Sequence, residues 1–170
     1  TNELTGHSIG ERTCNDIFKT FVTGLSTKLY HKFVNEPEGE DLLKVMKMYR
    51  MLGLPGAIGS MDCTHVMWGR CPLRHRWEAI GKSGSPSVAF QCVVDHNGRI
   101  MHVSKPFYGG TNDKTITSND SFSLRLLMGK YSRVEYLLHD ENGFPVLCKG
   151  VYLIVDGGHE KLGYVLCPNS

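Results

Sequence analysis

The stretch Val151-Tyr152-Leu153-Ile154-Val155-Asp156 is an apolar run that ends in a carboxylate and is followed by Gly157-Gly158. Its β-branched and aromatic residues are typical of a buried strand. An apolar strand that delivers a carboxylate to its end, beside small residues, is a common way to build a metal-ion site. Mg²⁺ and Mn²⁺ are hard cations that prefer carboxylate oxygens. This stretch therefore predicts a strand of the central sheet with a candidate ion ligand at its end.

Two other aspartates have similar settings. Asp62 lies within Gly59-Ser60-Met61-Asp62-Cys63-Thr64-His65-Val66, and Asp113 follows Gly109-Gly110-Thr111-Asn112. If three ionised carboxylates converge, each pair at ~4 Å costs about 4 kcal/mol at an effective dielectric constant of ~20. A divalent cation reverses the sign of that energy, and two such ions can clamp the attacking and leaving oxygens of a phosphodiester. The three aspartates therefore suggest metal-assisted phosphodiester chemistry.

Bulk composition sets wide limits on the class of protein. A chain of 170 residues is long enough for one domain. Its net charge of +2 is too weak to indicate nucleic-acid binding by itself. No apolar stretch approaches ~18 residues, so we expect no membrane span. The six cysteines form no C-x-x-C pair, which favours reduced, intracellular thiols. The chain lacks an initiator Met, and we expect a fragment or a processed product.

The first fifty residues have helical periodicity. Ser8 followed by Glu11 fits a capping box that opens a helix over residues 8–34. Apolar residues recur at three- and four-residue spacing and predict one buried stripe, formed by Ile17, Phe18, Phe21, Val22, Leu25 and Leu29. A second helix is expected over residues 41–51, stopped by Gly53-Leu54-Pro55-Gly56.

From residue 57 the period changes to that of strands. Asn97-Gly98 between two apolar runs predicts a hairpin. The first expected segments are a strand over 57–68, a loop over 69–87 and hairpin strands over 88–94 and 99–103. A Gly-rich turn over 104–112 and a helix over 113–130 follow. The last expected segments are a short edge strand over 136–138, a strand over 151–155 and an extended tail over 161–170. This order predicts an α/β or α+β domain with a mixed sheet and flanking helices, preceded by a short helical segment.

The same order occurs in ribonuclease-H-like domains, in which a strand with an aspartate is followed by an antiparallel hairpin, a helix and a strand parallel to the first. Asp62 would then lie on the first strand and Asp156 at the end of the parallel one. Adjacent strands are about 4.8 Å apart, so parallel neighbours would bring these two carboxylates within reach. Asp113 would lie at the start of the helix between them.

The chain resembles the catalytic domain of Harbinger-type (PIF/Harbinger) transposases and their domesticated nuclease-like relatives. The segments that carry the resemblance are Gly53 to Val66 with Trp68 and Cys71-Pro72, then Gly109-Gly110-Thr111-Asn112-Asp113, and Tyr152-Leu153-Ile154-Val155-Asp156-Gly157. It covers roughly residues 50–168. We therefore expect a helical N-terminal segment over residues 1–52 and a ribonuclease-H-like nuclease domain over residues 53–170.

The resemblance implies a nuclease of the aspartate-aspartate-glutamate type, a hydrolase that cuts and joins DNA with Mg²⁺ or Mn²⁺. Asp62, Asp113 and Asp156 match its acidic metal-site positions, and they are the expected catalytic residues. The family's glutamate falls beyond Ser170, so we expect the domain to be incomplete at its C-terminus and inactive alone, whereas the parent protein is expected to be active. The resemblance also implies a DNA partner, a separate Myb-like DNA-binding partner protein and a location in the nucleus, with the cytoplasm as the alternative.

Several alternatives stay open. Asp113 could be a helix N-cap, and His65 could orient Asp62, contact phosphate or be structural. The basic run of Arg70, Arg74 and Arg76, with Trp68 and Trp77 interleaved, could follow a DNA backbone or be solvated surface. Cys63, His65, Cys71 and His75 could form a zinc site, although their spacing fits the usual pattern poorly. The whole domain could also be a catalytically silent relative that acts as a DNA, chromatin or protein-interaction module.

Overall fold

The structure is a computed structural model that describes residues 10–156, 163 and 165–166. The chain divides into two compact units, residues 1–35 and residues 36–170. In the first unit, α1 (Glu11–Gly24) continues through a π-helical turn (Leu25–Leu29) into α2 (Tyr30–Phe33). The expected helix is thus confirmed over its described part, while the expected cap at Ser8 lies outside the described residues.

The prediction of a buried stripe on this helix is wrong for the structure described. None of the residues of α1 is buried, and the side chain of Phe18 is 65% exposed. The periodic apolar residues do form one amphipathic helix, but over the described residues 10–35 of the first unit no second element covers them. Periodicity predicts which side chains share a face, and it says nothing of whether a partner layer exists.

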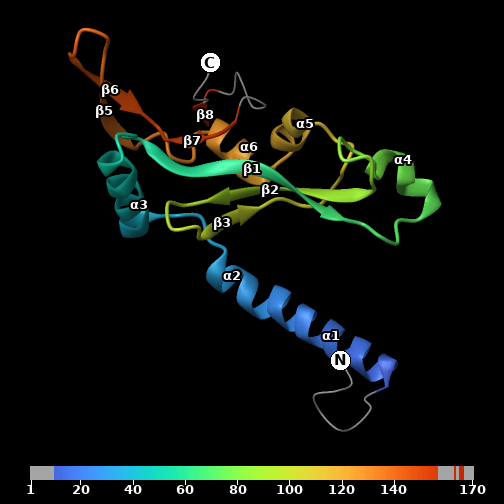
Figure 1. Cartoon of the computed structure of the whole chain (residues 1–170). Coiled ribbons are helices and arrows are strands. Elements are labelled where there is room, and N and C mark those ends of the chain that lie inside the picture. The colour runs from blue at the N-terminus through green and yellow to red at the C-terminus, as the bar shows by residue number, and fades with distance from the viewer. Residues whose placement is uncertain (1–9, 157–162, 164, 167–170) are drawn as a thin grey trace. The chain divides into compact units, whose positions relative to one another are not determined.

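The second unit contains a six-stranded mixed sheet (Figure 1) with strand order β3-β2-β1-β7-β8, and β4 pairs with β2. The strands are β1 (Ala57–Met67), β2 (Ser87–Val94), β3 (Ile100–Val103), β4 (Phe107–Tyr108), β7 (Tyr152–Ile154) and β8 (Val165–Leu166). β1 pairs antiparallel with β2 and parallel with β7. The α/β class with a mixed sheet and flanking helices is confirmed, and the order is consistent with a ribonuclease-H-like fold.

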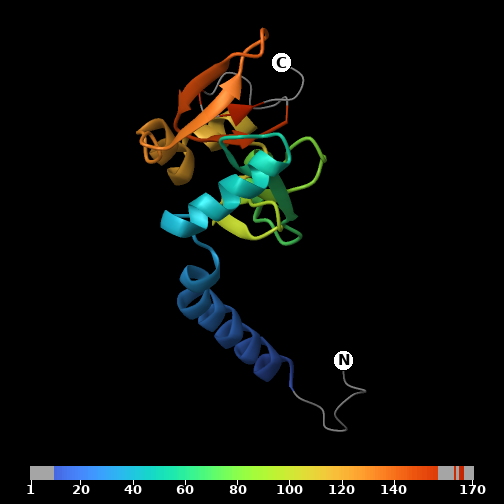
Figure 2. The ribbon, with the colours of Figure 1, turned by 90° about the vertical axis from the view of Figure 1, so that its left-hand side faces the viewer.

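Helices cover both faces of this sheet. α3 (Gly39–Met51) packs on the face that includes Ser60, whose side chain hydrogen-bonds that of Tyr49. α6 (Ser121–Leu127) packs on the face that includes the next residue, Met61, whose Sδ lies 4.0 Å from Ser123 Oγ. Successive strand residues point to opposite faces, so β1 supplies both layers of the core. α3 and α6 can be followed in Figure 2.

The compact second unit begins at Glu36, earlier than the expected boundary at residues 52 and 53. The reason is that α3 belongs to the core of the sheet domain. Leu42, Val45 and Tyr49 are buried in the same cluster as Ile58 and Phe122. Ion pairs add to this packing: Arg99 bridges Asp41 and Asp95, and Glu36 pairs with Arg125 and Lys130.

The expected single helix over residues 113–130 is wrong, because the chain forms two helices there. α5 (Asp113–Ser118) ends at Asn119, and α6 begins with Asp120 as its N-cap. The Asp120 carboxylate accepts a hydrogen bond from Ser123 N at 2.9 Å and one from His102 Nε2 at 2.7 Å. The buried hydrogen bond between Asp120 and His102 of β3 fixes the break between α5 and α6. Sequence periodicity cannot predict this break, because it depends on a contact between distant residues.

Two hairpins complete the unit. The expected β2–β3 hairpin is confirmed: Asp95 accepts hydrogen bonds from Asn97 N and Arg99 N, and Gly98 has a φ of +77°. The expected edge strand over residues 136–138 is instead half of a separate two-stranded sheet, β5 (Glu135–His139) and β6 (Pro145–Lys149). Asp140 closes that turn by accepting from Asn142 N and Phe144 N. The extended tail predicted over 161–170 is described only at residues 163, 165 and 166, where β8 lies parallel to β7.

Candidate functional site

Asp62 and Asp156 lie at corresponding positions of the two central parallel strands. β1 and β7 pair in the register Gly59 with Leu153 and Ser60 with Ile154. Each aspartate follows that last pair by two residues, so both project from the same face of the sheet. Both are exposed, whereas Leu153 and Val155 point into the core. The parallel pairing therefore predicts that these two exposed carboxylates lie near each other at this end of the strands.

Asp113 contacts β1 at Cys63, the residue next to Asp62. Its carboxyl group and the thiol of Cys63 share a hydrogen bond. Burial, the negative charges of Asp113, Asp62 and Asp156, and this hydrogen bond raise the pKa of the Cys63 thiol to about 12. All three predicted aspartates thus act electrostatically on one thiol, which remains protonated near neutral pH.

Asp113 is the first residue of α5 and not its cap. The cap is Asn112, whose side-chain oxygen accepts a hydrogen bond from Lys114 N at 2.8 Å. The N-cap alternative for Asp113 is therefore excluded. Because Asn112 caps the helix, the carboxyl group of Asp113 can bond the Cys63 thiol instead.

A buried polar network fixes α5 on the sheet. The side chain of Gln91, which is fully buried on β2, accepts from Thr117 Oγ1 at 2.7 Å and donates to Ser123 Oγ at 2.9 Å. Thr117 Oγ1 also lies 2.9 Å from the backbone oxygen of Asp113. One strand side chain thereby holds both helices, and buried networks of this kind specify a unique packing when every member is satisfied.

The Gly109-Gly110 turn that precedes Asp113 is packed too closely for side chains. A Cβ at Gly109 would lie 2.0 Å from Ser87 Oγ, and one at Gly110 would lie 2.6 Å from the backbone oxygen of Glu78. Gly81 makes the reciprocal approach, because its Cβ would lie 2.2 Å from the Gly109 oxygen. The glycines of this motif therefore bring the turn against residues 78–81.

A cavity of about 400 Å³ opens beside Asp113. Its walls are formed by His65, the Gly-rich turn and the loop that carries Lys82 and Ser83. His65 Nδ1 lies 3.2 Å from Ser87 Oγ, so its ring is anchored to β2. This arrangement does not bring His65 into a hydrogen bond with Asp62. Lys82 and Ser83 could not be predicted as lining residues, because only the fold brings their loop back to the Gly-rich turn.

The basic run lies between β1 and β2 and is partly ordered by aromatic stacking. The ring of His75 lies parallel to those of Trp68 and Tyr108, with centroid distances of 6.2 Å and 5.4 Å. His75 also bonds the Tyr108 hydroxyl and accepts from Arg74 Nε, each at 2.8 Å. Arg70 and Arg76 are exposed. Arg74 is therefore part of the support of this loop, while Arg70 and Arg76 are available to a ligand.

The pair of aspartates fits a hard divalent ion by the chemistry of its donor oxygens. Among the residues that the structure describes, no group of three or more His, Cys, Asp or Glu side chains is arranged to hold a metal ion. Asp113 is thus not gathered with Asp62 and Asp156 into one ligand set, and the four residues of the zinc alternative do not form a site. Mg²⁺ is commonly held by one or two carboxylates with water and substrate phosphate oxygens. A two-carboxylate site is compatible with that preference.

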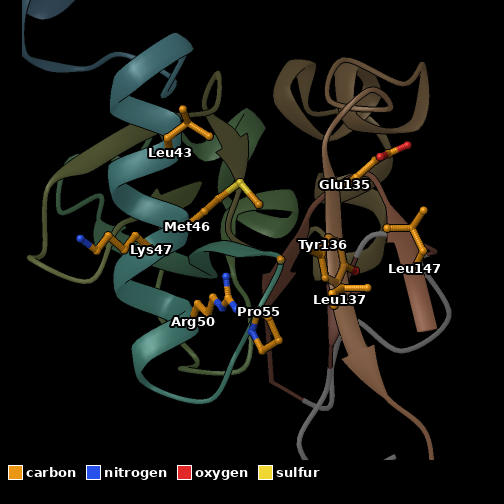
Figure 3. Close-up of a pocket in the computed structure, with 10 residues that line it drawn as sticks. Leu43, Met46, Lys47, Arg50, Pro55, Glu135, Tyr136, Leu137 and Leu147 are labelled. Carbon is orange, nitrogen blue, oxygen red and sulfur yellow. The ribbon is translucent and has the colours of Figure 1, made fainter. Parts of the chain in front are cut away.

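A second hollow, of about 370 Å³, lies between α3 and the β5–β6 hairpin (Figure 3). Leu43 and Met46 line it from the helix, and Tyr136 and Leu147 line it from the hairpin. Its only carboxylate is that of Glu135, and none of the three predicted aspartates lines it. This hollow is therefore separate from the candidate site. No helix within residues 10–156 is both long and apolar enough to cross a membrane.

A mixed sheet with parallel and antiparallel neighbours and helices on both faces defines an α/β domain, consistent with a ribonuclease-H-like fold. Residues 31–159 match the family model described as plant transposon protein. The chain belongs to that family, and the resemblance to Harbinger-type transposases is confirmed.

Similar curated proteins agree with this assignment. The chain is 27% identical over 115 residues to Putative nuclease HARBI1 of Bos taurus and 26% identical to that of Homo sapiens, in each case over 66% of this chain and 32% of the relative. It is 26% identical over 162 residues to Protein ALP1-like of Arabidopsis thaliana, over 94% of this chain and 38% of the relative. The chain thus spans about a third of the length of these relatives. No solved structure matches it.

Proposed function

We propose that this chain is the metal-binding core of a DNA nuclease or transposase that cleaves phosphodiester bonds with Mg²⁺ or Mn²⁺. The observation that supports the proposal is the parallel register of β1 and β7, in which Ser60 pairs with Ile154 two residues before the exposed Asp62 and Asp156. Membership of a transposon-derived family and similarity to proteins named as nucleases support the reaction class.

Different residues of this chain would bind the ion, position its ligands and contact the DNA. Asp62 and Asp156 would hold the ion, and the bound ion would polarise the phosphate and favour attack by water. The amide of Cys63 donates to Asp62 Oδ1 at 2.7 Å, which fixes the orientation of that carboxylate. Asp113 holds the protonated Cys63 thiol, so we assign it a positioning role beside the ion site. Lys82 and His65, which line the adjacent cavity, would contact the DNA phosphates.

The proposed substrate is DNA, and the proposed location of the protein is the nucleus. From the resemblance to Harbinger-type transposases, we infer that a separate Myb-like DNA-binding protein is a partner.

Nicking of supercoiled plasmid by a longer protein that contains this chain tests the function. We expect Mg²⁺- or Mn²⁺-dependent nicking that falls at least about 100-fold in Asp62→Asn and in Asp156→Asn, and that persists in Glu141→Gln, an exposed acid on the β5–β6 turn. Nicking that both aspartate variants retain would rule the mechanism out.

One observation favours a second candidate, a catalytically silent module that binds DNA, chromatin or protein. Within the described part of the chain, no three-membered group of potential metal ligands is present. For this candidate the longer protein would bind DNA without nicking it at any Mg²⁺ or Mn²⁺ concentration, and Asp62→Asn would leave DNA affinity unchanged.

A further inference from the structure

The segment of residues 68–86, here called the basic loop, concentrates positive charge at one place. It contains Arg70, Arg74, Arg76 and Lys82 against the single acid Glu78, a net charge of +3, whereas the whole chain carries only +2. The loop is closed at its base, because Trp68 N donates to Pro86 O at 2.8 Å and Ile80 bridges Pro86. It is thus a closed excursion of the β1–β2 hairpin, with α4 (Arg76–Ala79) within it (Figure 1).

Two large apolar side chains of the basic loop face solvent. The side chain of Trp77 is 87% exposed and that of Leu73 is 80% exposed. Trp68 behaves differently: it is half-buried and stacks on His75. An indole ring that is exposed to water lacks the favourable free energy of burying its large apolar surface. Exposed aromatic residues of this kind commonly mark binding surfaces.

The exposure of Trp77 does not come from a loosely held loop. The neighbouring His75 is stacked between Trp68 and Tyr108 and bonds the Tyr108 hydroxyl. On the other side of Trp77, the backbone oxygen of Glu78 accepts from Gly110 N at 2.9 Å. Trp77 is therefore presented from a supported position between two anchored residues.

The basic loop also reaches the cavity beside Asp113. Lys82 and Ser83 belong to the loop, and they line the same cavity as His65 and Asp113. A ligand bound along the loop would thus continue into the cavity beside Asp113.

These features together match the chemistry of unpaired DNA. Arginine and lysine side chains attract the phosphate backbone, and an exposed aromatic ring stacks on a base whose face is free. In a regular duplex the base faces are already stacked on one another, so a ring such as that of Trp77 gains little. We propose that the basic loop binds unpaired DNA, with Trp77 stacked on an exposed base, Arg70 and Arg76 on the phosphates, and the strand directed toward the cavity at Asp113. The choice of DNA rests on the proposed nuclease function, whereas the binding itself requires no metal ion.

Binding to labelled 20-nucleotide oligonucleotides in EDTA tests this inference. We expect Trp77→Ala to weaken binding of single-stranded DNA about tenfold, as the loss of one base–aromatic stack predicts, and to change duplex binding by less than about twofold. Trp77→Phe should restore most of the affinity, because it keeps a stacking ring. Arg70→Gln should weaken both complexes and reduce the slope of log K against log salt by about 0.7 for the single strand.

The chain offers a matched control and a direct signal. Leu73→Ala removes an exposed apolar side chain of the same loop and should change single-strand affinity by less than about twofold. Trp68 and Trp77 are the only tryptophans, so the quenching of fluorescence by single-stranded DNA should disappear largely in Trp77→Phe. Wild-type affinity of Trp77→Ala, an equal loss on duplex DNA, or tighter binding of RNA of the same sequence would each overturn the proposal. Failure of the nuclease proposal alone would leave these metal-free measurements unchanged.

Discussion

Asp62 and Asp156 extend from two strands that pair in parallel. The register aligns Ser60 on β1 with Ile154 on β7, two residues before each aspartate. A substitution of either side chain therefore changes the ligand set while leaving the strands intact. Asp62 also acts on its cross-strand partner: burial and the Asp62 charge together raise the pKa of Cys92. The electrostatic potential around Asp62 is thus negative, which favours the binding of a cation.

Asp120 is the carboxylate on which acid stability is expected to depend. Burial raises its pKa, but hydrogen bonds from His102 and from Ser123 N, with the charge of His102, outweigh burial and leave the pKa below its ordinary value. A folded-state pKa below the unfolded one contributes stability at every pH above the unfolded value of about 4, and the contribution is lost as the pH falls through the folded pKa. Urea denaturation should therefore show a free energy of unfolding that declines below about pH 4.

The variant Asp120→Asn isolates this contribution. It should cost about 2 kcal/mol at pH 7, because a charged hydrogen bond is lost, and it should flatten the decline in acid. Asp16→Asn, at an exposed position on α1, is the control and should follow the wild-type curve. An unchanged acid limb in Asp120→Asn would show that other groups set the pH dependence.

At the scale of elements, the sequence predicted what depends on near neighbours. The β2–β3 hairpin follows from Asn97-Gly98, and β1 and β7 follow from short apolar runs, since those signals are local. The break at Asp120 was missed, because it depends on His102 across the sheet. The burial of α1 was mispredicted for a related reason: a helix face is buried only if another element covers it.

The Gly-rich turn gives a prediction about packing. Gly109→Ala should destabilise the protein by about 2 kcal/mol, because its Cβ would meet Ser87 Oγ and two backbone oxygens, and cores tolerate such overpacking poorly. Gly69→Ala is the matched control, since nothing lies within 4 Å of its Cβ and it should change stability by less than about 0.5 kcal/mol. Equal unfolding midpoints for the two variants would contradict the packing account of this motif.

At the scale of the whole molecule, the hydrophobic core is confined to the second unit. Every buried residue of the core cluster lies between Leu42 and Val155. We therefore expect a fragment of residues 36–170 to fold cooperatively without residues 1–35, with a single thermal transition followed by circular dichroism. Starting the fragment at residue 53 removes Leu42, Val45 and Tyr49 from the core and should abolish that transition. A cooperative transition in the shorter fragment would contradict the placement of the boundary at Glu36.

The order of elements predicted the parallel pairing of β1 with β7, from which Asp62 and Asp156 extend. That the two aspartates form one site stays a prediction. The contact of the Asp113 carboxyl group with the Cys63 thiol could not be predicted, because it depends on how α5 packs on the sheet. Likewise Trp77 gave no signal distinct from Trp68 until their exposures could be compared.

The central claim is that Asp62 and Asp156 hold one divalent ion together. Titration of the full chain with Mn²⁺, followed by electron paramagnetic resonance of the free ion, tests it most directly. We predict that the chain binds one Mn²⁺ ion at this site, and that Asp62→Asn and Asp156→Asn each weaken its binding at least about tenfold, because both carboxylates are ligands of the same ion. Wild-type Mn²⁺ affinity in either single variant, or two Mn²⁺ ions of which each variant loses a different one, would contradict the claim.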